Sequence, residues 1–264
     1  MLPSSRFTLL AAAAVVGLAG VSAARAGIIY QDTFNRTGPL NGSSPTTVNA
    51  VDGGSSGATW TAPSWNTDGT EVVLGSGAAN VEGAASLPFT PQAGFIYTIS
   101  ETTVWANVPT TGLQNGAWLA LGYSASNGGG GKQYNQVVNP SAWMLMRSNP
   151  ASNNENEAFF GSPSTSIGTA GGTTDIALVL NTQSSHWTLD WYVNSTSVYT
   201  ATFTTNPTIS TVSFGNNGYS NGNSNTLSAI QNFTLSADVP EPAALGLLAI
   251  GGVALLLGKR RKVA

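Results

Sequence analysis

The chain has 264 residues, a formal net charge of −3 and no cysteine. The lack of cysteine excludes a disulfide framework, a thiolate zinc site and a cysteine nucleophile. From Gly27 to Asp238 there are three basic residues against eleven acidic ones, a net charge of −8, which argues against a nucleic-acid partner. Only 8% of residues are charged, and Gly, Ser, Thr and Asn separate short apolar runs, as is typical of exported all-β proteins.

Residues 1–26 have the pattern of a secretory signal peptide. Arg6 precedes a long apolar stretch, and the segment contains no acidic residue. A buried N-terminal helix is the alternative, but this stretch is apolar on every face, which favours a signal helix. Ala24 and Ala26 fit the A-x-A rule for signal peptidase, which predicts cleavage before Gly27.

The segment 27–238 is expected to form one β domain. Its apolar runs are short, rich in β-branched and aromatic residues and bounded by Gly, Asn and Pro, with no comparably long helical period between them. In the run HWTLDWYVN, Trp187, Leu189, Trp191 and Val193 alternate with other residues, so one face of this strand belongs to the core. The predicted strands are 27–34, 70–75, 94–106, 116–124, 142–148, 175–182, 186–194, 197–203, 209–215 and 230–236.

Strands without helices must bury their apolar faces by packing sheet on sheet or by closure. We therefore predict an antiparallel β-sandwich. The Gly/Ser-rich stretches at 38–57 and 124–131 are expected to be loops within it, since nothing in them marks a domain boundary.

Few residues offer catalytic chemistry. His186 is the only histidine, and its place after two serines at the end of a predicted hairpin favours a solvated turn over a Ser/His/Asp system. Glu155 and Glu157 are spaced to share one strand face, as the two carboxyls of a glycosidase must, but a solvated loop is the alternative. Asp190 is alone on its strand face. We predict no catalytic residue.

An Asn-rich stretch at 215–225 is the candidate ligand-binding segment, because amides and an aromatic ring are groups that bind sugars. A flexible polar loop is the favoured alternative. The candidate residues are Asn216, Asn217, Tyr219 and Asn221. Five tryptophans could likewise stack on sugar rings, although most are expected in the core: Trp60, Trp65, Trp105, Trp118 and Trp143.

No cofactor or metal site is predicted. With one histidine and no cysteine, only oxygen ligands are available, which leaves calcium as a possible ion without a supporting motif. The Asp-Gly pairs within 52–54 and 67–69 are expected to be turns rather than calcium ligands.

Residues 239–264 form a tripartite C-terminal segment. The stretch 243–258 is uncharged and would span about 24 Å as a helix, short for a bilayer core but extendable by flanking basic side chains. By the positive-inside rule these basic residues would stay cytoplasmic. They are Lys259, Arg260, Arg261 and Lys262. The tetrapeptide VPEP before the helix is expected to be extended and accessible, because proline donates no backbone hydrogen bond. Its residues are Val239, Pro240, Glu241 and Pro242.

These three parts, in this order, resemble the PEP-CTERM sorting signal of bacterial exported proteins. The resemblance implies an exosortase that recognises VPEP, cleavage near the motif after transient membrane anchoring, and release or transfer to the cell surface. It also implies a bacterium that makes extracellular polysaccharide. The residues of VPEP are then acted upon by another enzyme and are not catalytic.

The domain itself resembles concanavalin A-like, laminin-G-type jelly rolls. The pieces that carry this resemblance are DTFNR at the start of the domain and W-x-L-x-W-Y-V-N after DIALVLNT as a hairpin. The pieces GPLNG, ATWTA, AWLALGY, AWMLMR and NFTLS also resemble the domain often found ahead of PEP-CTERM signals. The resemblance implies a jelly-roll fold and leaves several functions open.

The leading hypothesis is a non-enzymatic, exported, exosortase-processed protein of the cell surface or extracellular polysaccharide matrix. A carbohydrate-binding module of that matrix is the alternative. A glycoside hydrolase or lyase that uses Glu155 or Glu157 is a third hypothesis, weakened because the E-x-D-x-x-E motif of laminarinase-like hydrolases is absent.

Overall fold

The structure is a computed structural model, and the residues it describes are 27–74, 82–105, 118–125, 140–147, 155–159, 165–169, 172–217 and 228–238. All of them belong to one unit, Ala26–Asp238. The predicted signal segment 1–26 and membrane helix 243–258 lie outside the described residues. Within the described ranges, no helix has the length and hydropathy needed to cross a membrane.

The regular secondary-structure elements of the described residues are all strands. They are β1 (Gly27–Asp32), β2 (Thr37–Pro39), β3 (Thr47–Val48), β4 (Trp65–Asp68), β5 (Val72–Leu74), β6 (Glu82–Pro88), β7 (Ile96–Trp105), β8 (Trp118–Ser124), β9 (Pro140–Arg147), β10 (Glu155–Phe159), β11 (Thr165–Thr169), β12 (Gly172–Asn181), β13 (Thr188–Val193), β14 (Thr196–Thr202), β15 (Thr211–Asn217) and β16 (Ser228–Asp238).

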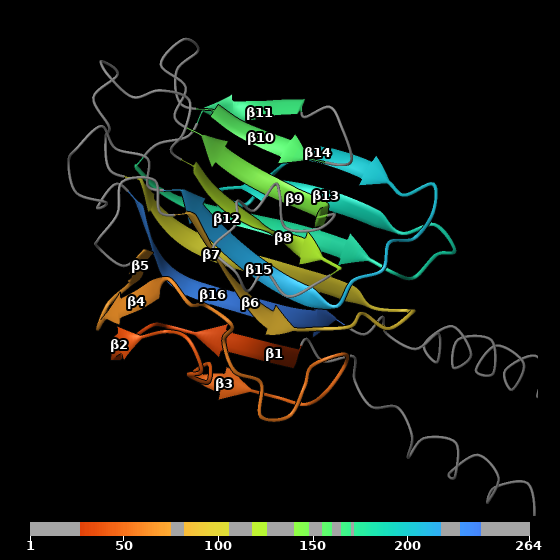
Figure 1. The fold of residues 1–264 in the computed structure, drawn as a ribbon. Coiled ribbons are helices and arrows are strands. Elements are labelled where there is room, and N and C mark those ends of the chain that lie inside the picture. The colour runs from red at the N-terminus through yellow and green to blue at the C-terminus, as the bar shows by residue number, and fades with distance from the viewer. Residues whose placement is uncertain are drawn as a thin grey trace, which may run out of the picture. The chain divides into compact units, whose positions relative to one another are not determined.

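The strands build two sheets that stack face to face (Figure 1). The large sheet has ten strands in the order β14-β13-β12-β7-β16-β5-β4-β2, with β1 paired to β16 and β3 paired to β1. The small sheet has six strands in the order β11-β10-β9-β8-β15-β6. All the strand pairs are antiparallel, which confirms the predicted antiparallel β-sandwich.

Each of the ten predicted strands corresponds to a strand of the structure, and β12 and β13 form the predicted hairpin. The sequence pattern missed β2, β3, β4, β6, β10 and β11. The expectation of a loop over the whole of 38–57 is wrong, because β2 and β3 fall partly or wholly within it. These strands are only two or three residues long, so they carry no alternation that a pattern could detect.

Strand β6 was missed for a different reason. Its sequence, EGAASLP, is built mainly from small residues with weak β propensity. It is nevertheless paired along its whole length with β15, and a side chain at Gly83 would come within 2.7 Å of Leu74 and 3.1 Å of the Trp65 indole nitrogen. Small residues are therefore required there by close packing against the N-terminal segment.

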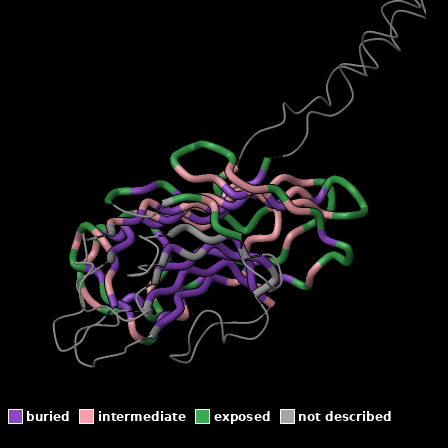
Figure 2. Tube along the Cα trace, turned by 90° about the horizontal axis from the view of Figure 1, so that it is seen from above, coloured by how far each residue is buried: buried purple, intermediate pink, exposed green. Residues whose placement is uncertain are grey.

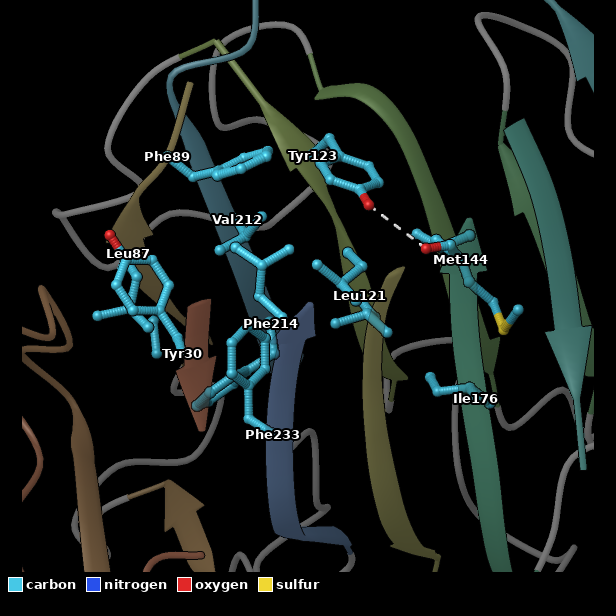
Figure 3. Close-up of a cluster of buried hydrophobic side chains, with 14 of the residues drawn as sticks. Tyr30, Leu87, Phe89, Leu121, Tyr123, Met144, Ile176, Val212, Phe214 and Phe233 are labelled. Carbon is cyan, nitrogen blue, oxygen red and sulfur yellow. Dashed lines mark hydrogen bonds between the residues drawn. The ribbon is translucent and has the colours of Figure 1, made fainter. Parts of the chain in front are cut away.

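The core lies between the two sheets (Figure 2). Buried and more exposed residues alternate along β12, whereas β15 is buried from Thr211 to Asn216. Phe214 of β15 is the centre of an aromatic cluster, with ring centroids 4.9 Å from Trp65, 5.0 Å from Trp60 and 6.0 Å from Phe233 (Figure 3 shows part of this cluster). Each large side chain buried in this way contributes about 1.5–3 kcal/mol to folding.

A buried tyrosine joins the sheets directly. Tyr123 of β8 donates from its hydroxyl towards the main-chain oxygens of Tyr97 and Leu178, at 3.2 and 3.4 Å. Both acceptors belong to the large sheet. Burial raises the pKa of Tyr123 well above its usual value, so the hydroxyl keeps its proton and remains a donor.

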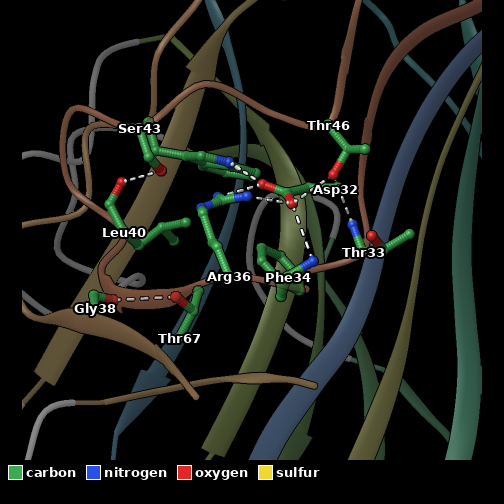
Figure 4. Close-up of polar contacts among 10 residues, drawn as sticks. Asp32, Thr33, Phe34, Arg36, Gly38, Leu40, Ser43, Thr46 and Thr67 are labelled. Atoms are coloured by element: carbon green, nitrogen blue, oxygen red, sulfur yellow. Dashed lines mark hydrogen bonds and ion pairs between the residues drawn. The ribbon is translucent and has the colours of Figure 1, made fainter. Parts of the chain in front are cut away.

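The carboxylate of Asp32 organises the segment that follows β1 (Figure 4). Arg36 donates to both of its oxygens, at 2.8 and 2.7 Å, and the indole nitrogen of Trp60 donates to Oδ2 at 2.7 Å. The amide of Phe34 and the hydroxyl of Thr46 complete the shell. Asp32 is fully buried, and this network is what makes a buried charge tolerable.

Glu101 is a core residue that the sequence pattern did not reveal. It lies on the inward face of β7, 1% exposed, and neither of its carboxyl oxygens has a hydrogen-bond partner. Its main-chain neighbours on the flanking strands are the buried apolar residues Ile176 and Phe233. Burial raises the pKa of Glu101 well above its usual value, so the fold favours the uncharged acid.

The Glu101→Gln variant should lose the part of the pH dependence of stability that comes from titration of Glu101. The folded-state pKa of Glu101 is raised, so the protonated side chain contributes to the stability of the fold below its ordinary pKa of 4.5. This contribution is lost as the pH rises towards and through the folded-state pKa. Gln does not titrate, so the free energy of unfolding of the variant relative to the wild type should increase with pH. The slope should reach at most about 1.4 kcal/mol per pH unit.

Urea denaturation of both proteins at about pH 5 and about pH 8 measures this difference. The paired measurement cancels the other titrating groups, which are common to both proteins. Parallel dependences on pH in the two proteins would contradict the prediction.

Candidate functional site

The structure places some of the sequence-predicted site residues and leaves others outside its described part. The sorting and processing residues at 24–26 and 239–262, together with Tyr219 and Asn221, lie outside the described residues. Gly27 begins β1. Asn216 and Asn217 belong to β15, where they pair with β6 and β8, and Asn216 is buried. The expectation that these two residues belong to a polar loop is therefore wrong, because the sheet extends through them.

The candidate catalytic residues are divided between separate elements of the described chain. Glu155 and Glu157 are placed in β10, opposite Arg147 and Leu145 of β9. His186 is exposed in the β12–β13 connection, with Nδ1 3.3 Å from the main-chain oxygen of Phe203. Among the described residues, no group of three or more His, Asp or Glu side chains is arranged to hold a metal ion.

The remaining sequence candidates have structural roles where they are described. Trp60, Trp65 and Trp143 are buried. Asp52 and Gly53 have positive φ angles of 51° and 100°, as a turn requires. Asp68 accepts hydrogen bonds from the amides of the next turn residues, which lower the pKa of its carboxyl.

A hollow on the outer face of the large sheet is the candidate functional site. It has a volume of about 330 Å³ and lies over β7, β12 and β13, on the side away from the core. We call it the outer hollow. Its described lining consists of Thr98, Ser100, Asp175, Ile176, Ala177, Val179, Tyr192 and Ser195.

The strand register explains why the sheet is hollowed at this point. Ala177 of β12 lies directly between Ser100 of β7 and Tyr192 of β13. Residues that face each other across antiparallel strands point to the same side of the sheet. The small side chain of Ala177 thus forms a low floor between a hydroxyl and an aromatic ring, and Val179 extends this floor along β12.

The carboxylate of Asp175 is positioned by a chain of hydrogen bonds across the outer face. The Thr102 hydroxyl donates to Asp175 Oδ1 at 2.6 Å, and the Asn232 amide donates to the Thr102 hydroxyl at 2.9 Å. Asn232 in turn accepts from the Thr102 main-chain amide at 3.2 Å. Three neighbouring strands therefore fix one exposed acceptor at the rim of the outer hollow.

A tight turn closes the other side of the outer hollow. Asn194 and Ser195 connect β13 to β14 with φ angles of 48° and 64°, values that suit a two-residue type I′ hairpin. The Asn194 side chain accepts a hydrogen bond from the Asp175 main-chain amide through Oδ1 at 3.0 Å. The Asn194 main-chain amide donates to the Asp175 main-chain oxygen at 2.8 Å. The turn is thereby attached to β12, and Ser195 is placed in the lining.

This arrangement offers a ring, several hydroxyls, one carboxylate and an apolar floor. Sugars present an apolar ring face and a rim of hydroxyl groups, so these are groups suited to hold a saccharide. The described lining contains a single carboxyl, that of Asp175, whereas glycoside hydrolysis requires two.

The outer hollow has no signature in the sequence. Its residues are spread over three strands and one turn, and no single stretch of sequence contains all of them. The alternation in HWTLDWYVN did place Tyr192 on the face opposite the core residues. What the sequence pattern lacked was the register that sets Tyr192 and Ser100 on either side of Ala177.

The C-terminal segment matches a protein-family model. Residues 238–262 match the PEP-CTERM protein-sorting motif, a range that contains VPEP, the apolar run and the basic cluster. The predicted sorting motif is confirmed, and it implies that the chain is an exported protein targeted to an exosortase. A search of the curated proteins gives no match.

The fold is similar to that of solved lectin-like domains. The Emp47p carbohydrate recognition domain aligns with a TM-score of 0.55 at 14% identity, covering 81% of this chain and 97% of that one. This likeness confirms the expected concanavalin A-like jelly roll, at the level of fold alone.

Two weaker likenesses carry no further conclusion. The potassium-bound Emp46p carbohydrate recognition domain aligns with a TM-score of 0.48 at 15% identity, over 67% of this chain and 87% of that one. An endo-1,3-beta-glucanase from Streptomyces sioyaensis aligns with a TM-score of 0.45 at 11% identity, over 91% and 100%.

The turn at Asn194 provides a test of the site's support. Replacing Asn194 by Val puts a β-branched residue at a positive φ angle and removes the acceptor for the Asp175 amide, so we expect a loss of about 1–3 kcal/mol in the free energy of unfolding. Asn194→Gly is the matched control, because it keeps the backbone geometry and loses only the side-chain contact. Equal stability of the Val and Gly variants would show that the turn conformation does not constrain this position.

Proposed function

We propose that this protein is delivered by its sorting motif to the cell surface or extracellular matrix, where its β-sandwich binds polysaccharide without catalysis. The sorting motif at 238–262 supports the route. The outer hollow supports the activity, because it sets the Tyr192 ring and a row of hydroxyls around an apolar floor at Ala177.

The outer hollow is the observation that carries the binding proposal. A sugar ring placed over Ala177 would stack against Tyr192 and exchange hydrogen bonds with Ser100, Ser195 and Asp175, all of which line the same space. The Emp47p domain, which shares this fold, is a carbohydrate recognition domain, and this agrees with the proposal.

The proposed route has three steps. Signal peptidase cleaves before Gly27, the apolar run at 243–258 holds the chain in the inner membrane, and Lys259 to Lys262 stop its transfer. Exosortase then acts near VPEP, after which the β-sandwich is released or attached at the surface. The domain ends at Asp238, directly before VPEP, so cleavage there leaves all sixteen described strands intact.

Changing Pro240, Glu241 and Pro242 together to Ala should block processing. We expect full-length protein to accumulate in the membrane fraction, because the recognition element is lost while the apolar run remains. Immunoblotting of membrane and surface fractions measures the outcome in cells that contain an exosortase. Pro63→Ala is the matched control, an exposed proline within the domain. Normal processing of the triple variant would refute the proposed route.

Filling the outer hollow should abolish glycan binding. Ala177→Leu places a bulky side chain on the floor, and Tyr192→Ala removes the stacking ring, so each should weaken binding at least about tenfold, or about 1.4 kcal/mol. Gln31→Leu is the control, an added Leu elsewhere on the outer face of the same sheet, on β1.

A glycan array read with the wild type and these three variants, with and without calcium, measures the effect. Uniformly flat signals from the wild type would remove the binding proposal. Equal loss in the Gln31→Leu control would show that binding occurs elsewhere on the sheet.

A further inference from the structure

The geometry points to the ligand class of the outer hollow: a saccharide that carries a free amine, in preference to its N-acetylated or carboxylated counterparts. This inference rests on the proposed binding function and adds the identity of the group that is recognised. It is carried by the placement of Asp175 and Tyr192 and by the distribution of charge in the domain.

The first argument is the fixed carboxylate. Asp175 is exposed at the rim, and the Thr102 hydroxyl holds its Oδ1 at 2.6 Å, which orients the group and costs a ligand little ordering entropy. A carboxylate only accepts hydrogen bonds, and an ammonium group only donates them, with three protons to distribute. A protonated amine can therefore bond to Asp175 and to a lining hydroxyl such as that of Ser195 at once.

The second argument is the aromatic ring beside the carboxylate. Tyr192 lies opposite Ala177, and Asp175 is two residues from Ala177 on the same face of β12. Such diagonal neighbours are about 7–8 Å apart or slightly less. That separation accommodates one sugar ring, with its apolar face on Tyr192 and a charged substituent towards Asp175. The ring also favours cations over anions through its quadrupole.

The third argument is the negative net charge of the domain. The segment from Gly27 to Asp238 contains three basic residues, and Arg36, whose side chain is described, is already paired with Asp32. A second carboxylate, Asp190, lies on the same outer face, opposite Val179. A sugar carboxylate or sulfate would meet negative potential on this face, whereas an ammonium group would be attracted to it.

The experiment compares three oligosaccharides by titration calorimetry with the purified mature protein: a glucosamine hexamer, an N-acetylglucosamine hexamer and a uronic acid hexamer. We expect the glucosamine hexamer to bind at least about tenfold more tightly than the other two at low salt, with the difference shrinking as salt is added. Asp175→Asn should reduce the difference to within about twofold. Glu71→Gln, which removes one negative charge outside the lining, should preserve it.

The outcomes separate the ligand class from the binding function. If the N-acetylated or the uronic acid hexamer binds as tightly as the amine, and Ala177→Leu abolishes that binding, the amine preference is refuted and the proposed function stands. If none of the three hexamers binds and the glycan array is also flat, both the amine preference and the proposed binding function are refuted. If Glu71→Gln lowers the preference as much as Asp175→Asn, the effect is one of net charge and the assigned role of Asp175 is refuted.

Discussion

The buried carboxylate of Asp32 is the constraint on which the arrangement of the two sheets depends. Removing a charge from water is costly, and here the cost is offset by Arg36 and by the indole of Trp60. Trp60 in turn packs against Phe214 of the small sheet and Phe233 of the large sheet. One polar residue at the end of β1 therefore sets the position of a ring that both sheets share. The segment from Asp32 to Trp60 contains only the short strands β2 and β3, which pair with β4 and β1, and the hydrogen bond from the Trp60 indole to Asp32 joins its two ends.

The parts of the fold that were predictable are those with a local signal. The strands β7, β12 and β13 carry β-branched and aromatic residues in alternation, and the sorting motif is a contiguous stretch with three recognisable parts. Strands such as β6 have no such signal, because their small residues are chosen by what packs against them. The inward position of Glu101 was hidden for a related reason, since a charged residue in an alternating strand is normally assigned to the solvent face.

The outer hollow was not predictable because it arises from register. Ala177 is an unremarkable residue in DIALVLNT until the pairing of β12 with both neighbours places it between Ser100 and Tyr192. The supports of Asp175 likewise come from β7, β16 and the turn at Asn194, which are distant in sequence. The Asn-rich stretch has the composition of a sugar-binding loop, yet its first residues complete β15. Composition identifies a chemical class of residue, whereas pairing decides which residues meet.

The central position of β16 has a mechanical consequence. This strand leads directly to the sorting segment, and it is hydrogen-bonded to β1 on one side and to β7 on the other. From Asn232 to Asp238, β16 pairs with β7 residue by residue, from Thr102 to Ile96, without a register shift. If the chain were tethered beyond Asp238 while a polymer pulled on the face formed by β7, β12 and β13, the load would run along these strands. Many hydrogen bonds would then resist together in shear, instead of opening one after another.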